Sequence, residues 1–208
     1  MLEQAIKFFV VFFVVVEPIS LIPLFAGLTE GASDSYKRRM AAKSVLIALA
    51  ICVLFALVGA RFLELMGIAL SSFRIAGGTL LFLISLEMVF ARTSGTRSTT
   101  PEREEARTRE DISVFPLAFP FIAGPGALAT ILLTAGEVGD RPLLFTGFLV
   151  VVALVLLVCW VLLRATPKLM GVLGVTGANV TSRLSGVILA ALAVQFIIDG
   201  IRGAFLNG

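Results

Sequence analysis

The sequence contains no histidine, and only two cysteines, one tryptophan and one tyrosine occur among its 208 residues. Without histidine, neither a Ser-His-Asp triad nor most zinc sites can be built. The two cysteines, Cys52 and Cys159, each lie deep inside an apolar run, so we expect core residues rather than a disulfide or a metal pair. We therefore expect no cofactor and predict that the protein is not an enzyme.

Charge is also scarce, because charged residues make up 15% of the chain and hydrophobic residues 58%. A soluble domain carries about 25% charged residues and about 45–50% apolar ones. Several uncharged runs reach the roughly 20 residues that a helix needs to cross a hydrocarbon core of about 30 Å. The chain is therefore predicted to be an integral membrane protein. Its partner would be the lipid bilayer and not nucleic acid, although the pI is near 9.2.

Charged positions divide the chain into six predicted spans. Their approximate bounds are 8–28, 43–61, 71–91, 112–136, 141–164 and 181–201. Of the 17 lysines and arginines, twelve fall on one side of these spans, and the five on the other side are Lys7, Arg61, Arg74, Arg141 and Arg202. Cytoplasmic loops carry the excess of basic residues. The side with twelve is therefore predicted to be cytoplasmic, with both termini outside.

One long polar stretch, residues 93–111, separates residues 1–92 from residues 112–208. It contains "TRSTTPEREEARTRED", in which basic and acidic residues nearly cancel. We interpret it as a solvated cytoplasmic linker between two halves, with a regulatory tail as the alternative.

The two halves resemble each other. "EPISLIPLF" matches "GPGALATIL" with Pro18 opposite Pro125, an offset of 107, and "RIAGGTLLFLIS" matches "RLSGVILAALAV" with Arg74 opposite Arg183, an offset of 109. A half with three spans ends on the opposite side from where it began, so the second copy would be inverted. The predicted fold is an all-α membrane protein of six transmembrane helices, arranged as two inverted-topology three-helix repeats. Secondary transporters are typically built in this way.

Proline and glycine interrupt the first span of each half. Proline lacks a backbone N–H and crowds the carbonyl four residues earlier, so a helix kinks or breaks there. We predict broken first helices in both repeats, with half-helices that restart at Pro18 and Pro125 and direct their N–H groups at one point. The alternative is a pair of simple proline kinks that only shape packing.

"EPISLIPLF", "FRIAGGTLLFLISLEM", "FPFIAGPGALAT" and "RLSGVILAALAVQFIIDGI" together resemble the signature segments of the MarC family, over nearly the whole chain apart from the linker. The resemblance implies a six-span bacterial inner-membrane protein that carries small neutral amino acids such as glycine, alanine and serine. The family's first motif usually reads Asp-Pro-x-Gly-Asn, whereas this chain has Glu17, Ser20 and Leu21 at the acidic, glycine and asparagine positions. That departure removes one polar ligand, and the Ser20 hydroxyl could replace part of it.

The candidate substrate-binding residues are Glu17, Pro18, Ser20, Gly124, Pro125, Gly126 and Thr130. A carboxylate at the depth of Glu17 is costly unless it is neutral, paired or hydrated. It could hold the substrate ammonium group, carry a coupling proton, or cap the half-helix at Pro18. Arg74 and Arg183 are expected to snorkel or to bind carbonyls of the broken helices.

We expect a secondary transporter whose substrate binds near the membrane midplane between the broken helices, through proton coupling or exchange. The alternative is a membrane channel, or an exporter for small solutes of another class. A channel usually presents rings of polar residues along its length, whereas the polar residues here concentrate at one depth.

The predicted topology can be tested with single cysteines in a cysteine-free background. Cysteines at Ser35 and Ser98 should react with an impermeant maleimide only from the cytoplasm, and a cysteine added after Gly208 only from outside. Labelling of the added C-terminal cysteine from the cytoplasm would remove the odd number of spans per half.

Overall fold

The structure is a computed structural model that describes residues 2–90 and 111–205, and every element in these two ranges is helical. The elements are α1 (Leu2–Val16), α2 (Leu21–Leu28), α3 (Asp34–Leu65), α4 (Leu70–Phe90), η1 (Ser113–Ile122), α6 (Pro125–Val138), α7 (Pro142–Arg164) and α8 (Thr166–Phe205). The connection that was predicted to be a linker, residues 93–111, lies outside the described residues except for Asp111.

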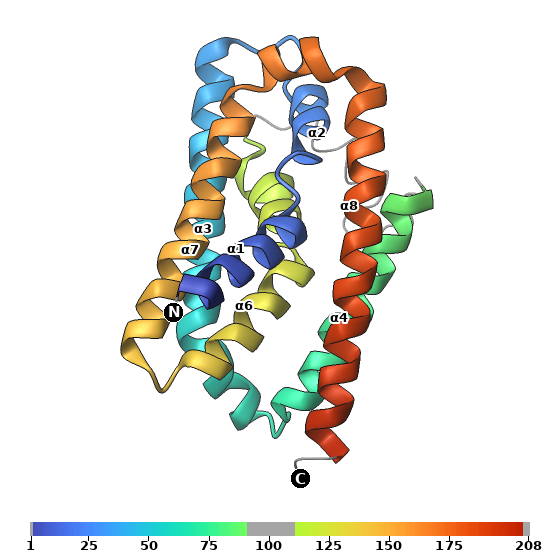
Figure 1. Cartoon of the computed structure of the whole chain (residues 1–208). Coiled ribbons are helices and arrows are strands. Elements are labelled where there is room, and N and C mark those ends of the chain that lie inside the picture. Colours follow the sequence, from blue (N-terminus) through green and yellow to red (C-terminus); the bar gives the residue numbers. More distant parts are fainter. Residues whose placement is uncertain (1, 91–110, 206–208) are drawn as a thin grey trace.

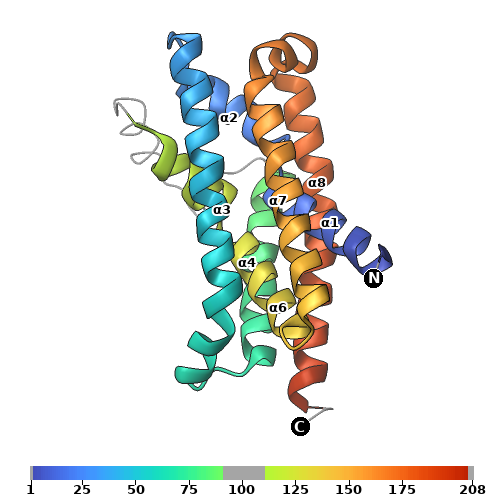
Figure 2. The same cartoon turned by 90° about the vertical axis from the view of Figure 1, so that its left-hand side faces the viewer.

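Four helices are long and apolar enough to cross a membrane by themselves: α3, α4, α7 and residues 179–205 of α8. Two further candidates are bent pairs, α1 with α2 at 40° and η1 with α6 at 59°. The described chain therefore has four to six candidate spans, and the bent pairs coincide with the predicted spans 8–28 and 112–136. α3, α7 and residues 179–205 of α8 run along the bundle, whereas α1 lies across it and the N-terminus sits part-way along their length (Figures 1 and 2).

Local sequence explains where several helices begin and end. α3 begins after Ser33, whose hydroxyl accepts a hydrogen bond from the backbone N–H of Tyr36 at 3.3 Å. It ends at a turn through Gly67, whose φ of +68° favours glycine. α7 begins with Pro142 in the first helical position, where a missing N–H costs nothing.

η1 is not a regular helix, because its backbone is kinked and includes non-helical residues. Phe115 and Phe119 have extended backbone angles, with φ/ψ of −123°/129° and −132°/131°. Each precedes a proline, and the ring of a proline disfavours the helical region for the residue before it. Pro116 and Pro120 therefore deform the element along its length and not only at its end.

α4 packs along its length against the second part of α8, from Gly186 to Gly203, and the two helices run in opposite directions (Figure 1). Glycines bring their backbones together, because a β-carbon on Gly78 would lie only 2.8 Å from the carbonyl oxygen of Ala193. Along the contact, the residue numbers of α4 decrease as those of α8 increase: Ser85 lies against Gly186, Gly78 against Ala193, and Ser71 against Gly200. Small residues of this kind let helices approach closely in a membrane, where lipid is as apolar as leucine.

The two halves of the chain are interleaved. Apart from α6 with α7 and α7 with α8, the prominent helix contacts join one half to the other: α3 packs on η1, α6 and α7, α4 on α6 and α8, α1 on α6, α7 and α8, and α2 on α7 and α8. The buried core therefore lies between the halves. Outward faces carry exposed apolar side chains such as Leu46, Leu57, Leu143 and Leu184, as contact with lipid requires.

The α4–α8 contact predicts opposite effects for two glycine-to-alanine substitutions. Gly78→Ala should lower the free energy of unfolding by about 1–3 kcal/mol, because the new methyl group meets a backbone carbonyl that cannot move alone. Gly147→Ala in α7 is the matched control, since nothing lies within 4 Å of its β-carbon position and alanine favours helix. Thermal unfolding in one detergent measures both, and equal destabilisation would contradict the packing described here.

Candidate functional site

The first helix break is centred on Glu17. Its backbone N–H still donates to the carbonyl of Phe13 at 3.0 Å, and the next residue, Pro18, has no N–H to continue the helix. Glu17 adopts a φ of +53°, in the left-handed region that a non-glycine residue enters at a cost of roughly 1–2 kcal/mol. Only 4% of this residue is exposed. A buried carboxylate on strained backbone is a combination typical of functional positions.

The prediction that the first half-helix restarts at Pro18 is wrong by three residues. Residues 18–20 form a turn, closed by the Ser20 N–H to the Glu17 carbonyl at 3.0 Å, and α2 begins at Leu21. Ser20 is the residue that precedes the helix, so Glu17 is not its N-cap. The N–H of Ile22 is bound to the carbonyl of Ile19 at 3.2 Å, and Pro23 has none. The start of α2 therefore offers fewer N–H groups to a ligand than predicted.

The second break is at Gly124, and here the predicted restart at Pro125 is confirmed. A β-carbon on Gly124 would lie 2.4 Å from the carbonyl oxygen of Pro120, so only glycine fits. Pro125 occupies the first helical position, and the N–H of Leu128 bonds the Gly124 carbonyl at 2.9 Å. Helix geometry leaves the N–H groups of Gly126 and Ala127 without an acceptor in α6. This helix start is the better anion-binding group of the two.

The structure brings the two breaks together. The β-carbon position of Gly126, in the first turn of α6, lies 3.4 Å from Val15 Cγ1, two residues before Glu17. It also lies 2.3 Å from Leu81 Cδ2 of α4. Gly126 therefore lets α4, α6 and the end of α1 converge at one buried point. Sequence reasoning assigned Gly126 to ligand approach and did not identify Leu81 as its neighbour.

The remaining candidate polar groups have different settings. Thr130 is buried, and its hydroxyl donates to the carbonyl of Gly126 at 2.9 Å, one turn earlier on α6. Ser20 is partly exposed, and its side chain makes no capping hydrogen bond to α2. The Thr130 hydroxyl is thus hydrogen-bonded within its own helix, whereas the Ser20 hydroxyl does not cap α2.

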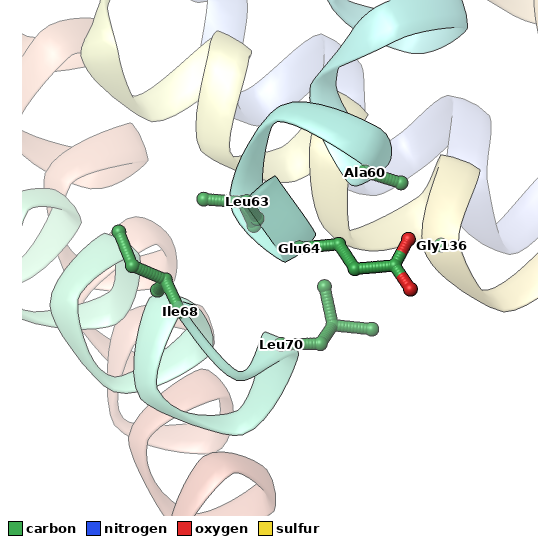
Figure 3. A pocket seen from close by; sticks show the side chains of 6 residues that line it. All are labelled: Ala60, Leu63, Glu64, Ile68, Leu70 and Gly136. Carbon is green, nitrogen blue, oxygen red and sulfur yellow. The ribbon is translucent and has the colours of Figure 1, made fainter. Parts of the chain in front are cut away.

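No predicted site residue lines either of two hollows on the described surface. One, of about 320 Å³, lies beside the end of α3, where the Glu64 side chain extends between Ala60 and Leu70 (Figure 3). The other, of about 340 Å³, is an almost wholly apolar groove between α3 and α7. The convergence point of the two breaks is filled by protein side chains in this conformation.

Among the described residues, two ion pairs lie away from the breaks. Arg74 of α4, which was expected to snorkel or to bind carbonyls of the broken helices, pairs with the Glu137 carboxylate of α6. Lys43 of α3 pairs with Asp111, which also accepts hydrogen bonds from the N–H of Ser113 at 2.9 Å and from its hydroxyl. These contacts, from Lys43 first and then Ser113, hold the pKa of Asp111 well below its usual range. Glu137 was missed, although it stands opposite Glu30 at the same offset of 107 as the prolines.

Comparison with known proteins gives one consistent result. The sequence model of a family described as "MarC family integral membrane protein" matches residues 2–205. The "UPF0056 membrane protein YhcE" of Escherichia coli K12 is 37% identical over 199 residues, which cover 96% of this chain and 92% of that protein. The "UPF0056 membrane protein MJ1677" of Methanocaldococcus jannaschii is 36% identical over 210 residues, covering 99% of each. No solved structure matches.

The crowding at Gly126 predicts a measurable coupling with Leu81. Gly126→Ala should destabilise the protein because its methyl group collides with the Leu81 side chain. Leu81→Ala removes the obstacle, so the double variant should be more stable than the sum of the single effects predicts, by about 0.5–3 kcal/mol. A double-mutant cycle on thermal unfolding measures this term. Additive effects would show that the two residues do not meet.

Proposed function

The chain belongs to the MarC family of integral membrane proteins, and we propose that it is a secondary transporter of small neutral amino acids such as glycine, alanine and serine. The observation that carries the proposal is the convergence of two broken helices beside a buried carboxylate. Secondary transporters place substrate where discontinuous helices of two repeats meet. A transported solute, and not a reaction, accounts best for a chain without histidine.

The proposed site is complementary to an amino acid. The first turn of α6 presents the N–H groups of Gly126 and Ala127 to the substrate carboxylate, with the positive end of the helix dipole behind them. Glu17 supplies the opposite charge for the ammonium group. The Leu81 side chain fills the space beside Gly126 in this conformation, so substrate binding requires Leu81 to move, and the space that it leaves admits a small side chain and excludes a ring. Ser20, three residues after Glu17, and Thr130, whose hydroxyl donates to the Gly126 carbonyl, are further candidate ligands, and Glu17 is also the candidate carrier of a coupling proton.

We further propose that the two halves are inverted repeats. Three sets of contacts recur when equivalent helices are exchanged: α3 contacts η1 as α7 contacts α1, α3 contacts α6 as α7 contacts α2, and α4 contacts α6 as α8 contacts α2. α4 and α8, which are equivalent helices, run antiparallel, as inversion requires. Cys52 and Cys159, also 107 residues apart, are both buried. With this arrangement the protein would lie in a bacterial inner membrane with both termini outside.

A ligand screen tests the proposed substrate class directly. Glycine, alanine and serine should raise the thermal unfolding temperature of the purified protein more than phenylalanine or lysine does, because only bound ligand stabilises the folded state. Counterflow in liposomes should then show exchange of the same amino acids. A screen won by aromatic or basic amino acids would refute the assignment.

The same screen on Glu17→Gln tests the role of the carboxylate. The variant keeps the side-chain shape and removes the charge, so binding of alanine should weaken by about 1.5–3 kcal/mol. Glu64→Gln is the matched control, since Glu64 lies in the hollow at the end of α3 and should leave binding unchanged. If binding survives in Glu17→Gln while transport loses its pH dependence, Glu17 carries the proton. Normal binding and normal pH dependence would remove Glu17 from the site.

A further inference from the structure

The ion pair between Arg74 and Glu137 closes one end of the interface between the halves. Arg74 belongs to α4 in the first half, and Glu137 to the last turn of α6 in the second half. Beside the pair, a β-carbon on Gly136 would lie 2.9 Å from Leu70 Cδ2. Charge and close packing thus hold α4 against α6 at this end.

The repeat places a second set of the same residues at the other end. Glu30 stands opposite Glu137 at the offset of 107, and Arg183 stands opposite Arg74 at the offset of 109. α2 contacts α8 just as α6 contacts α4, and Glu30 lies in the turn two residues after α2, so this turn follows a helix that packs on the helix carrying Arg183.

Arg183 and Glu30 do not form an ion pair in the described part of the structure. Glu30 and Arg183 are both exposed, and the ion pairs found among residues 2–90 and 111–205 do not include them. The position equivalent to Leu70 is Asn179, which is exposed, whereas Leu70 is partly buried against Gly136. In this one conformation the Arg74–Glu137 pair is formed, whereas the equivalent Arg183–Glu30 pair is not.

We propose that Arg74–Glu137 and Arg183–Glu30 are alternate locks of one transport cycle, each formed when its end of the pathway is closed. This inference rests on the proposed transporter function and inverted repeat. The structure is then the conformation closed at the Arg74 end, and the opposite conformation breaks this pair and joins Arg183 to Glu30. An inverted repeat makes the two conformations structural images of each other, with the roles of the halves exchanged.

The strength of the pairs suits this use. Both carboxylates and Arg183 are exposed, and the Arg74 side chain retains 21% exposure. A solvent-accessible ion pair shifts an equilibrium by a factor of at most about five, so it can form and break in every cycle. A deeply buried ion pair would be harder to break, because each separated charge would then stay buried without a partner.

The locks can be tested by labelling two reporter cysteines at equivalent positions, Leu70→Cys and Asn179→Cys, with a charged maleimide in detergent. Glu137→Gln should speed labelling of the Leu70 reporter about two- to five-fold and slow labelling of the Asn179 reporter. Glu30→Gln should shift both rates in the opposite direction. Glu3→Gln, which removes an exposed carboxylate of α1 that belongs to neither lock, should change neither rate.

The exchanged pair Arg74→Glu with Glu137→Arg should restore the original rates, which a loss of folding would not do. Rates that change at one end only, or in the same direction at both ends, would overturn the alternate locks. The labelling needs no substrate, so opposite shifts would support the locks even if the amino acid screen fails. A positive screen with unlinked labelling rates would leave the transport proposal standing without them.

Discussion

The need to satisfy every backbone N–H and C=O away from water governs this structure. A continuous helix meets that need within itself, whereas the breaks at residues 17–20 and 123–124 do not. Each break is therefore buried by helices of the other half. Val15 and Gly126 meet at this point, and Leu81 closes it from α4. The interleaving of the halves is the arrangement that makes irregular backbone tolerable at two places in an apolar chain.

The sequence predicted the features that depend on local chemistry. Proline and glycine determine where a helix fails, so both breaks and four continuous spans were located correctly, and the restart at Pro125 was exact to the residue. The restart after Pro18 was misplaced because Ser20 closes a turn on the Glu17 carbonyl before the helix forms. The distortion of η1 was also underestimated, since two prolines four residues apart act on the whole segment.

Features that depend on which helices become neighbours could not be read from the sequence. The sequence alone does not show which acidic residue pairs with Arg74, because the packing of α4 on α6 brings Glu137 to it. Gly126 looked like a place for a ligand to approach, and the structure shows that a leucine from another helix occupies the adjoining space. Conversely, the repeat itself contained a usable signal, because Glu30 and Glu137 share the offset of the two aligned prolines.

The interleaved packing has a consequence for biosynthesis. Helices α1 to α4 emerge from the ribosome first, yet among them no helix pair packs as extensively as they later pack on the second half. The first half therefore has no core to fold around, and its contacts close over separations of about a hundred residues. Until the second half is inserted, the segment around Glu17 lacks the helices that bury it and contacts lipid or the insertion machinery. A nascent chain truncated after α4 would present that segment, and the glycine face of α4, to the proteases that remove incomplete membrane proteins.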